Sequence, residues 1–280
     1  MPIIDIKNLS FSYAGATRPS LNSVNLMVEK GEFVVVTGPS GCGKTTLCRC
    51  LNGLVPNFYT GELTGDVLVC GLDIRQQPTN VLSRHVGFVF QNPENQLFSL
   101  TVERDVAFGP ENLGLTREET RERVDWALKA TGIEDLKNRA PYELSGGQQQ
   151  RAALASVLAM KPEVMVLDEP TSFLDPKSSL EILRVVAKLN KELGITVVLV
   201  EHRLDLATRY SNRIVVLDKG LVALDGPARS VYGKQAHLIG IGVPKVTLLF
   251  HLLKQDGVEI ERIPVTVEEG EEELRRILAD

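Results

Sequence analysis

The stretch Gly38-Pro39-Ser40-Gly41-Cys42-Gly43-Lys44-Thr45 decides the fold, because it matches the pattern G-x-x-x-x-G-K-[ST] of a phosphate-binding loop. The apolar run Phe33 to Val36 precedes it and a helical segment follows; this setting separates such a loop from a glycine-rich turn with an exposed lysine. Its glycines allow backbone N–H groups to wrap phosphates, Lys44 supplies a cation and the Thr45 hydroxyl a Mg²⁺ ligand. The sequence therefore predicts a site for ATP and Mg²⁺, with Thr46 as the next contact.

Three further apolar runs without polar alternation occur at Val164 to Leu167, Thr196 to Val200 and Arg213 to Leu217, and polar or charged residues follow each of them. Such runs are typical of parallel strands buried on both faces, in sheets that bind ligands at the carboxyl ends of their strands. Alternating apolar residues at 4–6 and 26–28 instead predict half-exposed strands. We expect an α/β fold with a mixed core sheet and an N-terminal antiparallel β subdomain.

Helical periodicity extends from Thr116 to Thr131 and from Gln148 to Met160. It predicts a helical subdomain inserted at about residues 101–160. Residues 1–233 are therefore expected to form one nucleotide-binding domain.

The chain changes character after Gly233, and residues 234–280 are expected to form a small C-terminal helical extension. Pro244, placed at a first helical position, leads an apolar stripe at i, i+3, i+4 and i+7, which indicates an amphipathic helix. A second helix is expected from Thr266, whose side chain would form a capping box with Glu269. We interpret its acidic start as a solvated helix turn rather than an interaction tail.

Composition limits the classes of function. A formal net charge of −5 argues against a surface built to bind nucleic acid phosphates. No stretch approaches the run of about twenty apolar residues that a spanning helix needs, and the first residues lack a basic region followed by an apolar one. The cysteines, too few and too clustered for a disulfide framework, are expected to be reduced thiols. We expect an intracellular protein that neither spans the membrane nor binds nucleic acid.

Two acidic residues, Asp168 and Glu169, directly follow the run that ends at Leu167. The carboxyl ends of parallel strands meet at one edge of a sheet, which places both carboxylates beside the phosphate-binding loop. We expect Asp168 to position the Mg²⁺ shell and Glu169 to polarise the attacking water. An acidic strand end facing solvent is the alternative.

The pentapeptide Leu144-Ser145-Gly146-Gly147-Gln148 opens a helix that is expected to begin near Gln149, where backbone N–H groups and the positive end of the helix dipole can receive an anion. It resembles the signature of ABC ATPases, whereas a flexible Ser-Gly turn is the simpler interpretation. In that family the signature of one subunit closes over the γ-phosphate held by the phosphate-binding loop of the other. The resemblance therefore implies a dimer in which Ser145 to Gln148 contact the neighbour's ATP.

The resemblance to ABC ATPases covers residues 3 to about 233 and implies roles for four more residues. Tyr13 matches the aromatic that stacks on adenine, and Gln91 the glutamine that senses Mg²⁺ and the γ-phosphate. Asp175 matches the loop that communicates across the dimer, and His202 the histidine that contacts the γ-phosphate. Alone, Tyr13 could be a surface aromatic, His202 a structural histidine, and the other two ordinary loop residues. The catalytic set so implied is Glu169, His202, Lys44 and Gln91, and the Mg²⁺ ligands are Thr45, Gln91 and Asp168.

A narrower resemblance lies in Val89-Phe90-Gln91-Asn92-Pro93-Glu94-Asn95-Gln96-Leu97-Phe98 and in the stretch Thr101 to Pro110. Both look like the ATPase subunits of energy-coupling factor transporters, which import vitamins, cobalt and nickel, and which similarly end in a helical extension that contributes to the dimer contact. Glu201-His202-Arg203 departs from many members, which have Thr-His followed by an acid or another residue. The histidine is therefore retained, but the exact subgroup of ABC transporter ATPases stays open.

The resemblance implies an ATP-hydrolysing subunit that lies peripherally on the cytoplasmic face of the membrane. Its implied partners are a second ATPase subunit, identical or paralogous, a transmembrane coupling subunit and a substrate-binding membrane subunit. The alternatives are the ATPase of another ABC importer family, a non-transport ABC ATPase and a subunit with a dead site. Chromosome and repair ATPases carry long heptad coiled coils, and ribosome-bound factors usually carry two motors in one chain; neither feature is present in this sequence.

Overall fold

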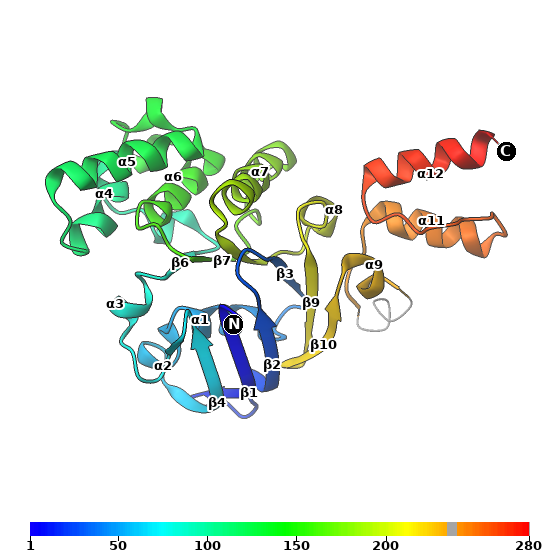
Figure 1. The fold of residues 1–280 in the computed structure, drawn as a ribbon, viewed down its shortest axis with the longest axis horizontal. Coiled ribbons are helices and arrows are strands. Elements are labelled where there is room, and N and C mark those ends of the chain that lie inside the picture. The colour runs from blue at the N-terminus through cyan, green and yellow to red at the C-terminus, as the bar shows by residue number, and fades with distance from the viewer. Residues whose placement is uncertain (234–239, 280) are drawn as a thin grey trace.

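Two β-sheets form the centre of the protein in the computed structural model, which describes residues 1–233 and 240–279 (Figure 1). The larger sheet has the strand order β10-β9-β3-β8-β7-β6. All of its neighbouring pairs are parallel except β9 and β10, so this sheet is mixed as predicted. Its strands are β3 (Phe33–Thr37), β6 (Val86–Val89), β7 (Val164–Asp168), β8 (Thr196–Val200), β9 (Arg213–Asp218) and β10 (Leu221–Gly226).

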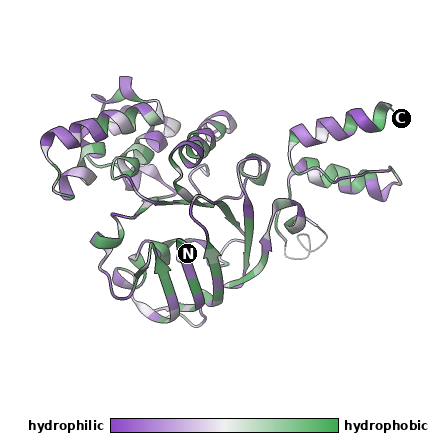
Figure 2. Cartoon of the chain, viewed as in Figure 1, coloured by the Kyte–Doolittle hydropathy of each residue, from purple (hydrophilic) through white to green (hydrophobic). Residues whose placement is uncertain are grey.

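The six-stranded sheet is buried on both faces, which explains why its strands read as unbroken apolar runs. Along β3, Phe33 and Val35 pack into one hydrophobic core with the helices α4 to α7, while Val34 and Val36 pack into a second core with α1 and the other sheet. Successive side chains of a strand point to opposite faces, so each strand contributes to both cores. Figure 2 shows these apolar strands at the centre of the molecule.

The smaller sheet is antiparallel, with the order β2-β1-β4-β5. Its first two strands pair Ile4 with Val28 and Ile6 with Leu26, the alternating positions from which the sequence predicts it. Buried and more exposed residues alternate along these strands except at the register shifts near Leu9, because the opposite face meets solvent. The strands are β1 (Ile4–Tyr13), β2 (Leu21–Val28), β4 (Gly61–Val69) and β5 (Leu72–Asp73).

Three helices, α4 (Val102–Asn112), α5 (Arg117–Thr131) and α6 (Gly146–Leu158), pack on one another as a helical lobe beside β6 (Figure 1). α5 begins with a capping box of Thr116 and Glu119 and ends at Gly132 in the left-handed conformation. These start and stop signals fix the helix that periodicity predicts between residues 116 and 131.

The remaining helices connect the strands or follow them. They are α1 (Lys44–Leu51), α2 (Leu54–Asn57), α3 (Thr79–Leu82), α7 (Pro176–Leu193), α8 (Leu204–Ala207), α9 (Ala228–Val231), α11 (Lys245–Gln255) and α12 (Val267–Ala279). α11 and α12 lie side by side and project from the domain next to α9 (Figure 1). They lie within residues 234–280, for which the sequence predicts a C-terminal helical extension; residues 234–239 and 280 of that range lie outside the described residues.

Three local predictions about helix ends are wrong. α6 begins at Gly146 rather than near Gln149, because Ser145 and Gln148 close a capping box. Pro244 caps α11 from the position before its first residue, and the Lys245 N–H that follows donates to Asp205 at 2.6 Å.

The third concerns Glu269, which accepts a hydrogen bond from the Val265 N–H at 2.8 Å and pairs with Arg229 at 2.8 Å. Its carboxylate therefore does not complete the box at Thr266, although the Thr266 hydroxyl accepts from the Glu269 N–H at 3.3 Å. An ion-pairing partner on α9 and a neighbouring backbone N–H therefore outcompete the local cap.

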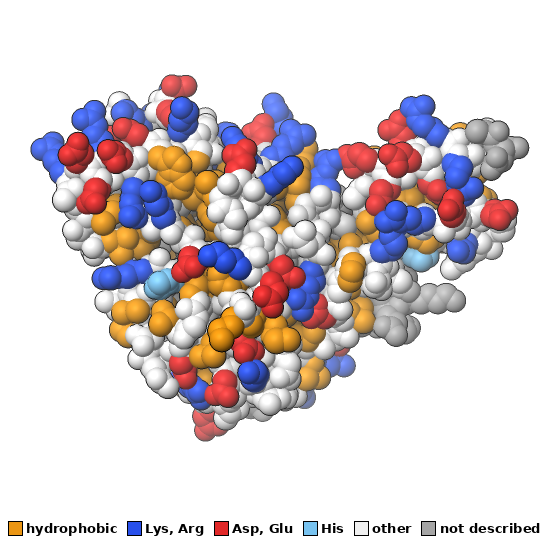
Figure 3. Space-filling view, viewed as in Figure 1, with side chains coloured by type: hydrophobic (Ala, Val, Ile, Leu, Met, Phe, Trp, Pro, Cys, Tyr) orange, Lys and Arg blue, Asp and Glu red, His pale blue; other side chains and the backbone are white. Residues whose placement is uncertain are grey.

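Charged side chains cover much of the surface, in contrast to the apolar strands of the buried sheet. On the face shown in Figure 3, acidic and basic side chains are interspersed over the helical lobe and over α11 and α12. None of the helices within residues 1–233 and 240–279 has both the length and the apolar character needed to cross a bilayer.

Tyr232 anchors the end of the domain to the segment that follows β8. Its ring is 1% exposed and its hydroxyl lies 2.7 Å from that of Thr208. Tyr232→Phe leaves the buried Thr208 hydroxyl unpaired and should lower the free energy of unfolding by about 1–2 kcal/mol, measured by urea denaturation. Tyr142→Phe, at a side chain that is 83% exposed, is the control and should change nothing. Equal stability of both variants would contradict the assignment.

Candidate active site

The phosphate-binding loop runs from the end of β3 to the start of α1, and two of its glycines cannot be replaced. Gly38 has a φ of 149°, and a Cβ there would lie 2.0 Å from the Leu217 carbonyl oxygen. Gly43 has a φ of 108°, and a Cβ there would lie 2.4 Å from the Ser20 carbonyl oxygen. The loop therefore passes so close to neighbouring backbone that only glycine fits.

Lys44 is the first residue of α1, and its side chain folds back over the loop. It is 5% exposed, and its Nζ donates to the carbonyl oxygens of Gly38 and Pro39, each at 3.0 Å. The loop bounds a cavity of about 310 Å³ lined by Ser20, Ser40, Gly41, Gly43, Lys44, Thr45, Thr46 and Glu169. A buried ammonium group beside the N-terminus of a helix is the charge distribution that suits a polyphosphate.

Asp168 ends β7 and contacts the same loop, because its Oδ1 accepts from the Thr45 hydroxyl at 3.2 Å. Burial raises the pKa of the Asp168 carboxyl above its ordinary value, and the Thr45 hydrogen bond only partly offsets this. A buried carboxylate next to a hydroxyl is an oxygen donor set of the kind that Mg²⁺ prefers, and a cation would relieve the cost of burying this charge. Asp168 and Thr45 therefore fit the predicted Mg²⁺ site.

Glu169 lies at the centre of the site, where its carboxylate joins three loops. It is 2.9 Å from His202 Nε2, 3.0 Å from Gln91 Nε2 and 3.3 Å from the Ser172 hydroxyl. Glu169 has a φ of 49°, a left-handed conformation that is uncommon for a residue other than glycine. Such backbone strain is held in place by surrounding structure and clusters at active sites.

His202 is held at the end of β8 by the residue before it. The carboxylate of Glu201, which is 2% exposed, accepts from the backbone N–H groups of His202 at 2.8 Å and Arg203 at 2.9 Å, and from the Thr171 hydroxyl at 2.5 Å. Glu201, the residue that departs from the family pattern, therefore fixes the backbone turn that carries His202. Sequence reasoning missed this role, although the departure at Glu201 was the available signal.

Two further predicted residues contact other parts of the site. Tyr13 lies with its hydroxyl 3.2 Å from that of Thr46 and 3.1 Å from Arg49 Nη1, which ties β1 to α1. Asp175 caps α7, where its carboxylate accepts from the Lys177 N–H at 2.9 Å and from the Ser178 N–H at 3.0 Å. Hydrogen bonding from the Ser178 hydroxyl, followed by its N–H, lowers the pKa of Asp175.

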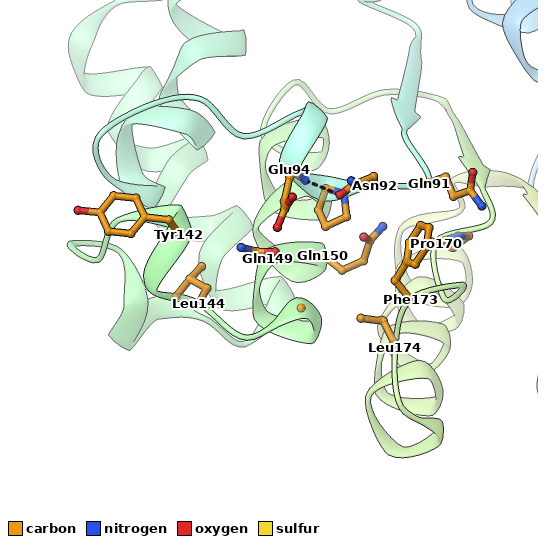
Figure 4. A pocket seen from close by; sticks show the side chains of 12 residues that line it. Gln91, Asn92, Glu94, Tyr142, Leu144, Gln149, Gln150, Pro170, Phe173 and Leu174 are labelled. Atoms are coloured by element: carbon orange, nitrogen blue, oxygen red, sulfur yellow. Dashed lines mark hydrogen bonds between the residues drawn. The ribbon is translucent and has the colours of Figure 1, made fainter.

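The signature segment lies apart from the phosphate-binding loop within one chain. Ser145 caps α6 by accepting from the Gln148 N–H at 3.4 Å, and the Gln148 side chain accepts from the Ser145 N–H at 2.9 Å. Gly146 lines a groove of about 490 Å³ with residues of the Gln91 loop, and Figure 4 shows this groove. None of residues 145–148 lines the cavity at Lys44. The structure thus groups the loop, both carboxylates, Gln91 and His202, and leaves the signature outside that group.

β3 leads into a strand–loop–helix phosphate cradle, the neighbouring β8 ends just before His202, and β7 beyond it ends at the pair of carboxylates. Together these features define a phosphate-loop nucleotide hydrolase. Comparison with known proteins narrows this class. The sequence profile of the family described as ABC transporter matches residues 21–172. The protein PH1815 of Pyrococcus horikoshii, which carries the name of an ABC transporter ATP-binding protein, is 45% identical over 98% of this chain and 97% of its own length.

Two solved structures resemble the whole domain. Clostridium perfringens cbiO1, part of the ABC transporter complex cbiONQ, superposes with a TM-score of 0.77 at 36% identity, covering 90% of this chain and 99% of its own. The ATP-binding cassette MJ0796, a dimer bound to ADP and Pi, superposes with a TM-score of 0.71 at 32% identity, covering 80% of this chain and 98% of its own. The chain belongs to the ATP-binding proteins of ABC transporters, which hydrolyse ATP, and the predicted fold class is confirmed.

Measurements of stability can test the role of the hydrogen bonds that Glu201 accepts. Glu201→Ala removes a buried charged acceptor from two N–H groups and from the fully buried Thr171, and should lower the free energy of unfolding by about 3 kcal/mol in chemical denaturation. Glu201→Gln keeps one acceptor oxygen for the two N–H groups and should lose less than half as much. Equal losses in the two variants would show that the backbone contacts to His202 and Arg203 carry little of the effect.

Proposed function

We propose that this chain powers an energy-coupling-factor-type importer for vitamins or for cobalt and nickel ions, from the cytoplasmic face of the membrane. The sequence from Val89 to Pro110 supports the proposal through its resemblance to such subunits. The observation that carries it is the extent of the likeness to cbiO1. That likeness covers 90% of the 280 residues, which is a larger share of the chain than residues 1–233 make up. The likeness therefore includes part of the C-terminal extension.

For hydrolysis we assign each group a task from its position. Lys44 neutralises the outer phosphates, and Glu169 accepts a proton from the attacking water. Gln91 and His202 hold the Glu169 carboxylate from opposite loops, at 3.0 Å and 2.9 Å. Tyr13 would supply the adenine contact at the edge of the loop. Thr45, Asp168 and Gln91 would hold Mg²⁺, which would supply charge neutralisation when bound.

The signature requires a second subunit. Ser145 to Gln148 lie outside the cavity of their own chain, but the start of α6 offers N–H groups and a positive helix end that an anion can use. We assign these residues to the ATP bound by a neighbouring ATPase subunit, identical or paralogous. The dimeric MJ0796 cassette is similar to 80% of this chain, and this similarity supports such a pair of subunits.

The extension offers a second contact for that pair. α11 and α12 leave a groove of about 630 Å³ between them, and its lining is mostly apolar, from Val246, Leu249, Phe250, Val267, Leu274 and Leu278. Both ends of α12 carry exposed apolar side chains, Val267 at 67% and Leu278 at 84% exposed. Exposed apolar side chains at this density favour a protein contact, and we assign it to the dimer.

The groove in Figure 4 is our assignment for the transmembrane coupling subunit, which in turn holds a substrate-binding membrane subunit. The Gln91 loop forms one wall, and two exposed aromatic side chains flank it: Tyr142, 83% exposed, and Phe173, 72% exposed. Aromatic residues beside polar groups are enriched where proteins bind one another. Because Gln91 also contacts Glu169, an inserted helix would act directly on the catalytic carboxylate.

Glu169→Gln should keep ATP affinity and lower the hydrolysis rate by about 100-fold or more, because the amide cannot accept the proton while the phosphate cradle is unchanged. Single-turnover hydrolysis and equilibrium binding of a fluorescent ATP analogue measure the two effects separately. Wild-type turnover in this variant would remove Glu169 from the role of base.

Purification of the tagged chain from its native membrane tests the transport assignment. We expect one transmembrane coupling subunit and one small substrate-binding membrane protein to copurify, and Tyr142→Asp to release them while leaving ATP hydrolysis by the isolated chain intact. Copurification of a pair of permease subunits that depends on a soluble binding protein would instead assign the chain to another importer family.

A further inference from the structure

A cluster of metal-ligating side chains lies away from the nucleotide site. Among the residues that the structure describes, Cys70, His85 and Glu163 each bring one ligand atom within 4.8 Å of the others. His85 and Glu163 immediately precede β6 and β7, whereas the phosphate-binding loop and Asp168 follow the opposite ends of parallel strands. The cluster therefore sits at the edge of the six-stranded sheet away from the ATP site.

Backbone hydrogen bonds hold the three residues in place. The His85 carbonyl oxygen accepts from the N–H groups of Glu163 at 2.9 Å and Val164 at 3.0 Å, and the Cys70 N–H donates to the Ile3 carbonyl at 2.7 Å. His85 Nδ1 already lies 3.1 Å from Glu163 Oε1. The ligands thus come from both sheets, on backbone positions that sheet pairing fixes before any ion binds.

Cys70 occupies an unusual place for a cysteine. It and Gly71 are the two central residues of the hairpin between β4 and β5, and both have positive φ, 52° and 78°. A two-residue turn of this type favours Asn, Asp or Gly at its first position. The half-buried cysteine therefore sits where backbone preference alone favours another residue.

We propose that Cys70, His85 and Glu163 form a binding site for a borderline divalent transition-metal ion such as Zn²⁺, with water as the fourth ligand. Thiolate, imidazole and carboxylate together match the donors of Zn²⁺ sites that keep one open position. Tetrahedral bonds of about 2.0–2.3 Å place ligand atoms roughly 3.5 Å apart. The three atoms lie within 4.8 Å of one another, so each distance shortens by about 1.3 Å at most when an ion binds. His85 and Glu163 are 38% and 45% exposed, which gives an ion access from solvent.

The protonation of Cys70 and the position of Lys30 both affect how a metal ion would bind to the cluster. Burial, followed by the nearby charge of Glu163, raises the pKa of the Cys70 thiol to about 11, although Lys30 acts in the opposite direction. Loading therefore replaces the thiol proton by the metal and releases one H⁺. Lys30 Nζ, 3.6 Å from Glu163 Oε2 on a 70% exposed side chain, can swing into solvent as the ion enters.

A bound ion would join the β4–β5 hairpin of the antiparallel sheet to the strand starts of the six-stranded sheet. The core containing Val67, Val69, Val86 and Val164 lies between these elements. The ion would thus clamp the two sheets together, and thermal stability should rise on loading.

Chelator-treated full-length chain titrated with Co²⁺, and then with Zn²⁺ as competitor, tests the site. We expect one equivalent of Co²⁺ to give a thiolate-to-cobalt charge-transfer band with the visible bands of tetrahedral cobalt, and Zn²⁺ to abolish them and to raise the melting temperature. Glu163→Gln should weaken Co²⁺ binding at least about tenfold. Glu62→Gln, at an exposed glutamate of β4, should bind as the wild type does.

Cys70→Asn separates metal binding from folding, because asparagine suits the left-handed turn position. This variant should fold with an unchanged or higher melting temperature in chelator, yet lose the charge-transfer band and the Zn²⁺-dependent shift. Cys42→Ser should keep both signals, since that thiol lies in the phosphate-binding loop. A cobalt spectrum without a thiolate band, or one that survives in Cys70→Asn, would overturn the proposal.

Discussion

The constraint on which the site depends is the shared carboxyl edge of three parallel strands. β3, β7 and β8 are neighbours in the sheet, so the segments that follow them must emerge side by side. That edge brings together the phosphate-binding loop, Asp168 and Glu169 at the end of β7, and the Glu201–His202 turn, although these segments lie far apart in the sequence. Burial of both sheet faces fixes the register, because a slip by one residue would exchange the two cores.

Close backbone approach adds a second, local constraint. The loop passes the Leu217 and Ser20 carbonyl oxygens so closely that Gly38 and Gly43 must be glycine. These contacts come from β9 and from the start of β2, so both sheets shape the cradle. The conformation of the phosphate-binding loop therefore depends on the packed domain as well as on the sequence of its eight residues.

The sequence predicts most of the fold because its signals are periodic and local. Unbroken apolar runs identify the buried strands, and the caps of α5 identify a helix to within a residue. Where side chains compete for partners, sequence reasoning fails: Glu269 leaves its expected cap for Arg229 and Val265, and Ser145 starts α6 three residues early. The bond between Glu201 and Thr171 and the contacts of Glu169 with Gln91 and His202 depend on loops that meet only after folding.

Glu169 shows why such a site can respond to events at a distance. Its carboxylate is held jointly by Gln91, which leads into the helical lobe, by Ser172, which precedes α7, and by His202, which follows β8. Its left-handed backbone leaves little freedom to compensate if one partner moves. A displacement of the helical lobe that withdraws Gln91 removes one of three bonds from the same carboxylate. With Glu169 as the proposed base, the geometry of catalysis and the position of the helical lobe are coupled through one side chain.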